Sequence, residues 1–214
     1  MDVKNQPLIA NINNFCQELE KEFDLIPSER KEKLQHISTY ISQKFETKET
    51  PSLIVICTHN SRRSHLGQIW LAVGADYYQL PAIQTFSGGT EATAFNIRAV
   101  KAMQRIGFLI STKAENNGNP IYQINWKAGM KPYEAFSKKY DHPANPKEKF
   151  AALMVCTQAD EGCPVVLGND FRLSLPYDDP KAFDETALEA AKYSERARQI
   201  GRQMLYLLSQ VTKG

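Results

Sequence analysis

The chain has 214 residues, of which 42% are hydrophobic and 23% are charged, a balance that supports a packed core and argues against a disordered chain. Its 26 lysines and arginines against 24 acidic residues give a net charge of +2, which lacks the basic excess typical of proteins that bind nucleic acids or membrane surfaces. At about 150 residues per domain, the length predicts one domain with an appendage.

Location and redox chemistry follow from the apolar runs and the cysteines. The longest apolar run, Phe150–Cys156, is far shorter than the roughly 20 residues of a membrane-spanning helix. The first residues lack the pattern of a secretory signal, so we expect a soluble, cytoplasmic protein. Four cysteines, Cys16, Cys57, Cys156 and Cys163, are too few for a disulfide framework in a chain this long. Thiol chemistry is therefore expected to be catalytic or redox.

The first 50 residues predict a polar, helical N-terminal extension. Apolar residues recur there at helical spacing behind the start signal Pro27-Ser28: Leu34, Ile37, Ile41 and Phe45. After Pro51 the pattern changes to Leu53–Ile56, a continuous apolar run typical of a buried parallel strand. Leu66–Tyr77 then predicts a helix.

The middle of the chain continues the alternation of strands and helices. Pro81–Phe86 predicts a second strand, closed by Ser87-Gly88-Gly89, and Phe95–Ile106 predicts a helix capped by Gly107. Residues 111–149 form a longer, loop-rich inserted segment with a strand predicted over residues 121–126 and a short helix over 133–140.

The last third predicts two more strands and a long helix. The strands are Phe150–Val155 and Asp170–Leu175, and the capping box Thr186-x-x-Glu189 opens the final helix. The fold class is therefore α/β, with an open, four-stranded, mostly parallel sheet flanked by helices over residues 51–214. In such sheets the active site lies at the carboxyl ends of the strands.

The most informative segment is Cys57-Thr58-His59-Asn60-Ser61-Arg62-Arg63-Ser64, between a predicted strand and a helix. Such a loop directs backbone N–H groups and the positive end of a helix dipole into one concavity, which suits an oxyanion. The predicted oxyanion-binding residues are Thr58, His59, Asn60, Ser61, Arg62 and Arg63.

Side chains of this loop have separate predicted roles. Arg63 can hold two oxygens of the anion with its planar fork, whereas Arg62 is expected to be a surface charge that attracts anions. The loop stabilises a thiolate, so Cys57 is the predicted nucleophile. Ser64 is placed to hydrogen-bond the sulfur. A buried structural cysteine is the alternative.

The pattern Cys57-x-x-Asn60-Ser61-x-Arg63-Ser64 between a strand and a helix resembles the active-site loop of the low-molecular-weight protein tyrosine phosphatase superfamily, which includes thioredoxin-coupled arsenate reductases. The resemblance runs from about residue 52 to 211, interrupted by residues 111–149. It implies a general acid in a later Asp-Pro, which maps to Asp179, although Asp before Pro is also an ordinary helix cap.

One further segment extends the resemblance, and one residue departs from it. Ser87-Gly88-Gly89-Thr90 resembles the turn beneath the catalytic loop of the family. Gln68 stands where some reductases carry an acidic residue for a bound potassium ion, so we do not predict that ion. We also predict no other metal and no cofactor.

The pair Cys156 and Cys163 resembles the redox segment of the arsenate reductases, in which a cysteine that ends a strand is followed seven residues later by another. The resemblance implies that Cys57 attacks arsenate, that Cys156 attacks Cys57, and that Cys163 then forms a Cys156–Cys163 disulfide for thioredoxin to reduce. A helical segment would hold these two Cα atoms about 10.5 Å apart, beyond the roughly 7 Å limit for a disulfide. The segment must therefore bend or unwind.

The favoured function is thus arsenate reduction, with an arsenate or phosphate oxyanion and thioredoxin as partners, and neither nucleic acid nor membrane. A phosphatase acting on phosphotyrosine is the first alternative, because it needs only Cys57, Arg63, Ser64 and Asp179. A non-catalytic module that binds an oxyanion is the second. The third, a zinc site of Cys57, His59, Cys156 and Cys163, matches no common ligand spacing.

Overall fold

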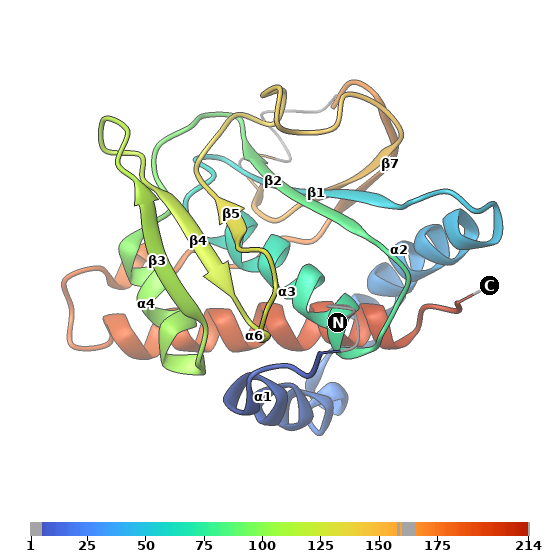
Figure 1. The fold of residues 1–214 in the computed structure, drawn as a ribbon, viewed down its shortest axis with the longest axis horizontal. Coiled ribbons are helices and arrows are strands. Elements are labelled where there is room, and N and C mark those ends of the chain that lie inside the picture. The colour runs from blue at the N-terminus through green and yellow to red at the C-terminus, as the bar shows by residue number, and fades with distance from the viewer. Residues whose placement is uncertain (1–5, 158, 160–165, 214) are drawn as a thin grey trace.

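A computed structural model describes residues 6–157, 159 and 166–213. The chain forms a parallel sheet and a small antiparallel sheet, with helices packed against them (Figure 1). The elements are α1 (Ala10–Glu20), η2 (Phe23–Leu25), α2 (Ser28–Glu46), β1 (Ser52–Cys57), α3 (Arg63–Tyr77), β2 (Gln84–Gly89), α4 (Ile97–Ile106), β3 (Leu109–Ala114), β4 (Ile121–Asn125), β5 (Tyr133–Ala135), β6 (Phe150–Met154), β7 (Asn169–Ser174), η3 (Pro180–Phe183) and α6 (Glu189–Ser209). None of the described helices is both long and apolar enough to cross a membrane.

The main sheet has four parallel strands in the order β2-β1-β6-β7, which confirms the predicted sheet. Every residue of β1 and of β6 is buried, as the continuous apolar runs of these strands predict for a sheet covered on both faces. In the register of this sheet Cys57, the last residue of β1, pairs with Gly89, the last residue of β2. The candidate site therefore begins at the carboxyl edge of the sheet.

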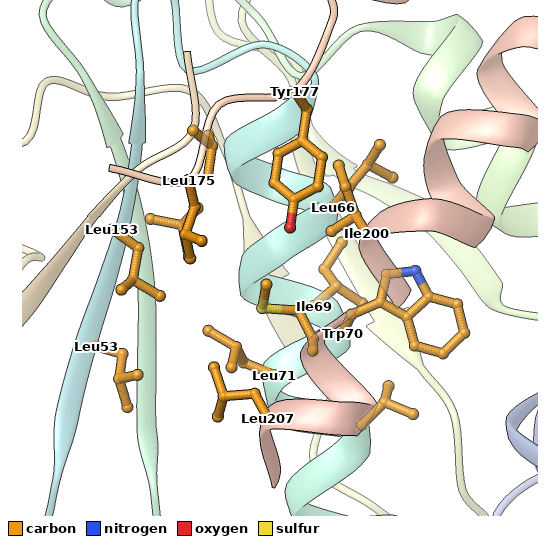
Figure 2. Close-up of a cluster of buried hydrophobic side chains, with 14 of the residues drawn as sticks. Leu53, Leu66, Ile69, Trp70, Leu71, Leu153, Leu175, Tyr177, Ile200 and Leu207 are labelled. Carbon is orange, nitrogen blue, oxygen red and sulfur yellow. The ribbon is translucent and has the colours of Figure 1, made fainter. Parts of the chain in front are cut away.

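Helices α3 and α6 pack closely against each other beside this sheet. Two glycines permit close packing of α3: a Cβ at Gly67 would lie 2.9 Å from Val55 Cγ1 in β1, and one at Gly74 would lie 2.6 Å from Leu208 Cδ1 in α6. Figure 2 shows leucines of the sheet side facing apolar residues of the two helices: Leu53, Leu153 and Leu175 face Ile69, Leu71 and Leu207. This packing fixes the start of α3, on which the loop after Cys57 ends.

The N-terminal helices share this core. Both α1 and α2 pack against α6, and their inward faces are fully buried through Ile12, Leu19, Leu34, Ile37 and Ile41. The predicted start of α2 is confirmed, since the helix begins at Ser28 directly after Pro27.

A second, antiparallel sheet occupies part of the inserted segment, in the order β3-β4-β5. The predicted strand over residues 121–126 is confirmed as β4. The predicted helix over residues 133–140 is wrong, because residues 133–135 pair with β4 as β5 and no helix follows up to residue 140. Strand β3 had not been predicted.

Helix ends agree with the sequence at α4 and differ at α6. The Asn96 side chain accepts a hydrogen bond from Arg98 N (2.9 Å), and Gly107 ends α4 in the left-handed region at φ 118°, as predicted. Helix α6 begins at Glu189, so the predicted capping box is wrong. The carboxylate of Glu189 accepts instead from Glu185 N (2.7 Å) and from Arg98 Nε (2.6 Å).

Candidate active site

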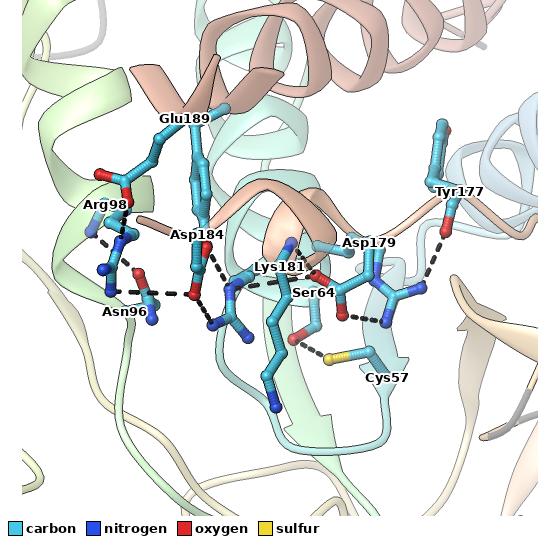
Figure 3. A network of polar contacts seen from close by, with 12 residues as sticks. Cys57, Ser64, Asn96, Arg98, Tyr177, Asp179, Lys181, Asp184 and Glu189 are labelled. Carbon is cyan, nitrogen blue, oxygen red and sulfur yellow. Dashed lines mark hydrogen bonds and ion pairs between the residues drawn. The ribbon is translucent and has the colours of Figure 1, made fainter. Parts of the chain in front are cut away.

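The loop from Cys57 to Ser64 leads from β1 into α3 and brings its polar side chains together. The Sγ atom of Cys57 lies 3.1 Å from Ser64 Oγ (Figure 3). Asn60 Nδ2 donates to the same oxygen at 2.8 Å. Because Ser64 Oγ accepts from Asn60, its own hydrogen is available to the sulfur. A hydroxyl that donates to sulfur stabilises a thiolate, which is the reactive form of a cysteine.

The backbone of the loop forms a cradle of amide donors. Asn60 adopts the left-handed conformation with φ 44°, which a short polar side chain tolerates. No hydrogen bond joins the backbone N–H groups of residues 59–62 to another of the described residues. Free amides ahead of a helix are suited to bind an anion.

Gly89 and the residues after it lie beneath this loop, as the resemblance implied. Thr90 N donates to Cys57 O (3.3 Å) and Glu91 N donates to Thr58 O (2.8 Å). A Cβ at Gly89 would lie 2.6 Å from Thr58 O and 2.7 Å from Asn60 N. Only glycine fits at this contact, because the obstructing atoms belong to the backbone.

Arg63 lies at the first position of α3 and is 8% exposed. Its Nη1 donates to Tyr177 O (2.8 Å) and its Nη2 to Asp179 Oδ2 (2.6 Å) (Figure 3). The buried Nε atom has no hydrogen-bond partner among the described residues. A buried guanidinium with an unused donor next to free amides is suited to an oxyanion ligand.

Asp179 is a helix cap, as its position before Pro180 allows, and it also forms an ion pair with the loop. Its Oδ1 accepts from Lys181 N (3.0 Å) and so caps η3, while its Oδ2 pairs with Arg63. The capping bond fixes the carboxyl group against Arg63, the predicted anion-binding arginine. The predicted acid therefore lies beside the loop.

Arg62 has different partners from Arg63, and the predicted surface position of Arg62 is wrong. It is 8% exposed rather than a surface charge. Its Nε donates to Tyr193 OH (2.6 Å) and its Nη2 to Asp184 Oδ2 (3.3 Å), and Tyr193 in turn donates to Asp184 Oδ1 (2.7 Å). Burial raises the pKa of Tyr193 to about 12. The guanidinium of Arg62 is thus bound to Asp184, directly after η3, and to Tyr193 of α6, which leaves its backbone N–H as the group available to an anion.

Cys156 follows β6, the strand next to β1. Val155 N donates to Ile56 O (2.8 Å), which extends the pairing of the two strands to their ends. The Sγ atom of Cys156 lies 3.3 Å from the hydroxyl of Thr58, the residue after Cys57. Both thiols are buried and free. Cys163, the third cysteine of the predicted relay, lies outside the described residues.

Two titratable residues near the loop had no signal in the sequence. His65 is fully buried, its ring stacks on Phe95 at 4.2 Å, and its Nδ1 lies 3.4 Å from Ser87 Oγ. Burial, with a smaller effect of Lys138, holds the pKa of His65 well below its usual value. Burial also lowers the pKa of Lys138 to about 8. Neither burial is predictable locally, because both depend on chain segments distant in the sequence.

Comparisons with known proteins agree with the geometry. No protein-family model matches the chain. Arsenate reductase 2 of Staphylococcus haemolyticus (strain JCSC1435) is 26% identical over 133 residues, which cover 60% of this chain and 78% of that protein. An arsenate reductase of Staphylococcus epidermidis (strain ATCC 12228) is 25% identical with the same coverage.

Solved structures provide a second comparison with known proteins. A crystal structure of a YwlE mutant from Bacillus subtilis matches with a TM-score of 0.51 and 14% identity over 75% of this chain and 98% of that one. A low-molecular-weight phosphotyrosine phosphatase from Vibrio cholerae matches with a TM-score of 0.48 and 16% identity over 74% of this chain and 95% of that one.

These findings confirm the resemblance stated from the sequence. The match to the Bacillus structure shows the fold, and the sequence similarity is to arsenate reductases.

Proposed function

We propose that this enzyme reduces arsenate to arsenite through a relay of Cys57, Cys156 and Cys163, with thioredoxin as the reductant. The observation that carries the proposal is the second buried thiol, because Cys156 follows the neighbouring strand β6 and contacts Thr58, the residue next to Cys57. The similarity to staphylococcal arsenate reductases supports it. A cytoplasmic location suits the relay, since thiols are kept reduced there.

The first step uses the loop. Arsenate is held by the free backbone N–H groups and by Arg63, whose buried Nε is an unused donor. The thiolate of Cys57 attacks arsenic and forms an S–As bond. An As–O bond breaks, and Asp179 protonates the departing oxygen, which leaves as water.

The later steps move electrons between sulfur atoms. The thiolate of Cys156 attacks Cys57 Sγ, so that an S–S bond forms and the S–As bond breaks with its electron pair left on arsenic. Arsenic is thereby reduced from As(V) to As(III), and arsenite leaves. The thiolate of Cys163 then attacks Cys156 and releases the Cys57 thiolate. A thioredoxin dithiol finally reduces the Cys156–Cys163 disulfide.

Single cysteine substitutions test the relay. We expect Cys156→Ser to abolish multiple-turnover reduction of arsenate but to leave aryl phosphate hydrolysis largely intact, because water can still attack a phospho-Cys57. Cys163→Ser should allow one turnover and then stop as a Cys57–Cys156 disulfide, visible as a mass loss of about 2 Da. Cys16→Ser is the matched control, since Cys16 is buried in α1.

Phosphotyrosine hydrolysis is the second candidate. The structure favours it through the assembly of Cys57, Ser64, Arg63 and Asp179, which is complete without any second thiol. If the parent enzyme hydrolyses an aryl phosphate but does not reduce arsenate with thioredoxin, the relay is wrong and this activity replaces it.

A further inference from the structure

We propose that Ser137 and Lys138, in the inserted segment outside the family resemblance, position the oxyanion loop by holding its left-handed turn at Asn60. The inference deepens the proposed function, because it concerns how the anion site of that same reaction is kept in shape. It assigns a role to a part of the chain in which the sequence showed none.

Direct hydrogen bonds join the two residues to both sides of the turn. Ser137 Oγ donates to His59 O at 3.1 Å, and Lys138 N donates to Asn60 Oδ1 at 2.8 Å. Ser137 is 2% exposed and Lys138 is 5% exposed. These bonds are shielded from water, so water cannot readily replace the partner that a substitution removes.

The same segment also holds the turn beneath the loop. Gly89 N donates to Lys138 O (3.0 Å), and Tyr140 N donates to Gly89 O (2.9 Å). Asn145 Nδ2 donates to Ser87 O at 3.0 Å. The inserted segment thus contacts both backbone layers of the site, the loop and the turn on which it rests.

Ser137 is itself held in place from two directions. Asn119, in the connection between β3 and β4, donates to Ser137 O (2.8 Å) and accepts from Ser137 N (3.1 Å). The Ser137 hydroxyl accepts from Thr93 N at 2.9 Å while it donates to His59 O. The hydroxyl therefore accepts one hydrogen bond and donates another, which fixes the direction of its O–H group.

Positioning of the turn matters for the chemistry because the N–H groups of the loop must converge on one point. Asn60 adopts a conformation that is unfavourable for most residues and persists only when its surroundings impose it. Ser137 binds the carbonyl of His59, and Lys138 binds the side chain of Asn60. The first contact engages the His59 carbonyl and the second fixes the Asn60 side chain, while the N–H groups of residues 59–62 have no partner among the described residues.

Protection of Cys57 by inorganic phosphate tests the proposal. Iodoacetamide alkylates Cys57, the peptide is quantified by mass spectrometry, and phosphate is titrated as the protecting anion. We expect Ser137→Ala and Asn119→Ala each to raise the half-protecting phosphate concentration about tenfold, with a similar loss in kcat/KM for an aryl phosphate. Ser111→Ala, on the exposed strand β3 of the same segment, is the control and should change neither value.

Phosphate protection and the thermal midpoint together distinguish positioning of the oxyanion loop from stabilisation of the whole fold. If Ser137→Ala and Asn119→Ala lower the thermal midpoint but leave phosphate protection unchanged, the segment only stabilises the fold and the proposal is overturned. If the parent enzyme shows neither reductase nor phosphatase activity, while phosphate protects it and protects the two variants less, the positioning role stands and the proposed function fails.

Discussion

Arg62 and Arg63 are adjacent in the loop, yet their guanidinium groups contact different partners. Arg63 reaches Tyr177 O and Asp179 next to the free amides, whereas Arg62 reaches Tyr193 and Asp184. The sequence predicted the position of Arg63 because its spacing from Cys57 places it at the start of a helix. It did not predict the burial of Arg62, whose partners lie more than 100 residues further along the chain.

Lysine substitutions distinguish the two arginines. Arg63→Lys should lower kcat/KM for an aryl phosphate by about two orders of magnitude, because a single ammonium cannot replace the planar fork. Arg62→Lys should reduce kcat/KM by less than tenfold and act mainly on the thermal midpoint, since it loses bonds to η3 and α6. Steady-state kinetics and thermal unfolding of both variants check this. Equal losses of kcat/KM would show that the anion contact has been assigned to the wrong arginine.

At the scale of elements, β1 and β6 were predictable and β3 and β5 were not. The central strands are continuous apolar runs because both faces of the main sheet are covered. Strand β3 is largely exposed, so its residues carry no apolar pattern, and β5 has only three residues. The pairing of β5 with β4 sets the conformation of residues 133–135, and this contact with another strand overrides the local pattern that suggested a helix.

The end of β2 allows a sharp test at this scale. Gly89→Ala would place a Cβ against Thr58 O, Asn60 N and Glu91 O. We expect it to displace the loop and to lower kcat/KM for an aryl phosphate by about 100-fold or more. Gly118→Ala is the control, because a Cβ there meets nothing within 4 Å, although its positive φ costs about 1 kcal/mol. Wild-type kinetics in Gly89→Ala would mean that the loop does not depend on this contact.

At the scale of the whole molecule, the N-terminal helices complete the packing around α6. The sequence predicted α2 from its apolar spacing, but the surface that it covers belongs to a helix about 160 residues further along the chain. Ser38 Oγ, for example, donates to Leu207 O at 2.7 Å. Such a contact has no local signature, so the sequence alone could give the helix but not its partner.

Truncation of one buried side chain of α2 measures how much its packing against α6 contributes to the free energy of unfolding. Leu34→Ala should lower the free energy of unfolding by about 2–5 kcal/mol, because it leaves a cavity beside α6. Activity per folded molecule should stay unchanged, since Leu34 is an apolar core residue of α2 and contributes no polar group to the loop. Gln35→Ala, at an exposed position of the same helix, should change stability by less than about 0.5 kcal/mol. Urea unfolding of both variants gives the comparison, and equal stabilities would mean that α2 is not part of the cooperative core.

The ion pair between Arg63 and Asp179 makes substrate binding an exchange reaction. In the anion-free enzyme the carboxylate of Asp179 occupies Arg63 Nη2, so an incoming oxyanion competes with a group of the protein itself. The measured affinity for the anion is then the intrinsic affinity reduced by the free energy of that pair. In the mechanism that we propose, the same displacement also releases the Asp179 carboxyl group from Arg63, so anion binding and release of the general acid are coupled.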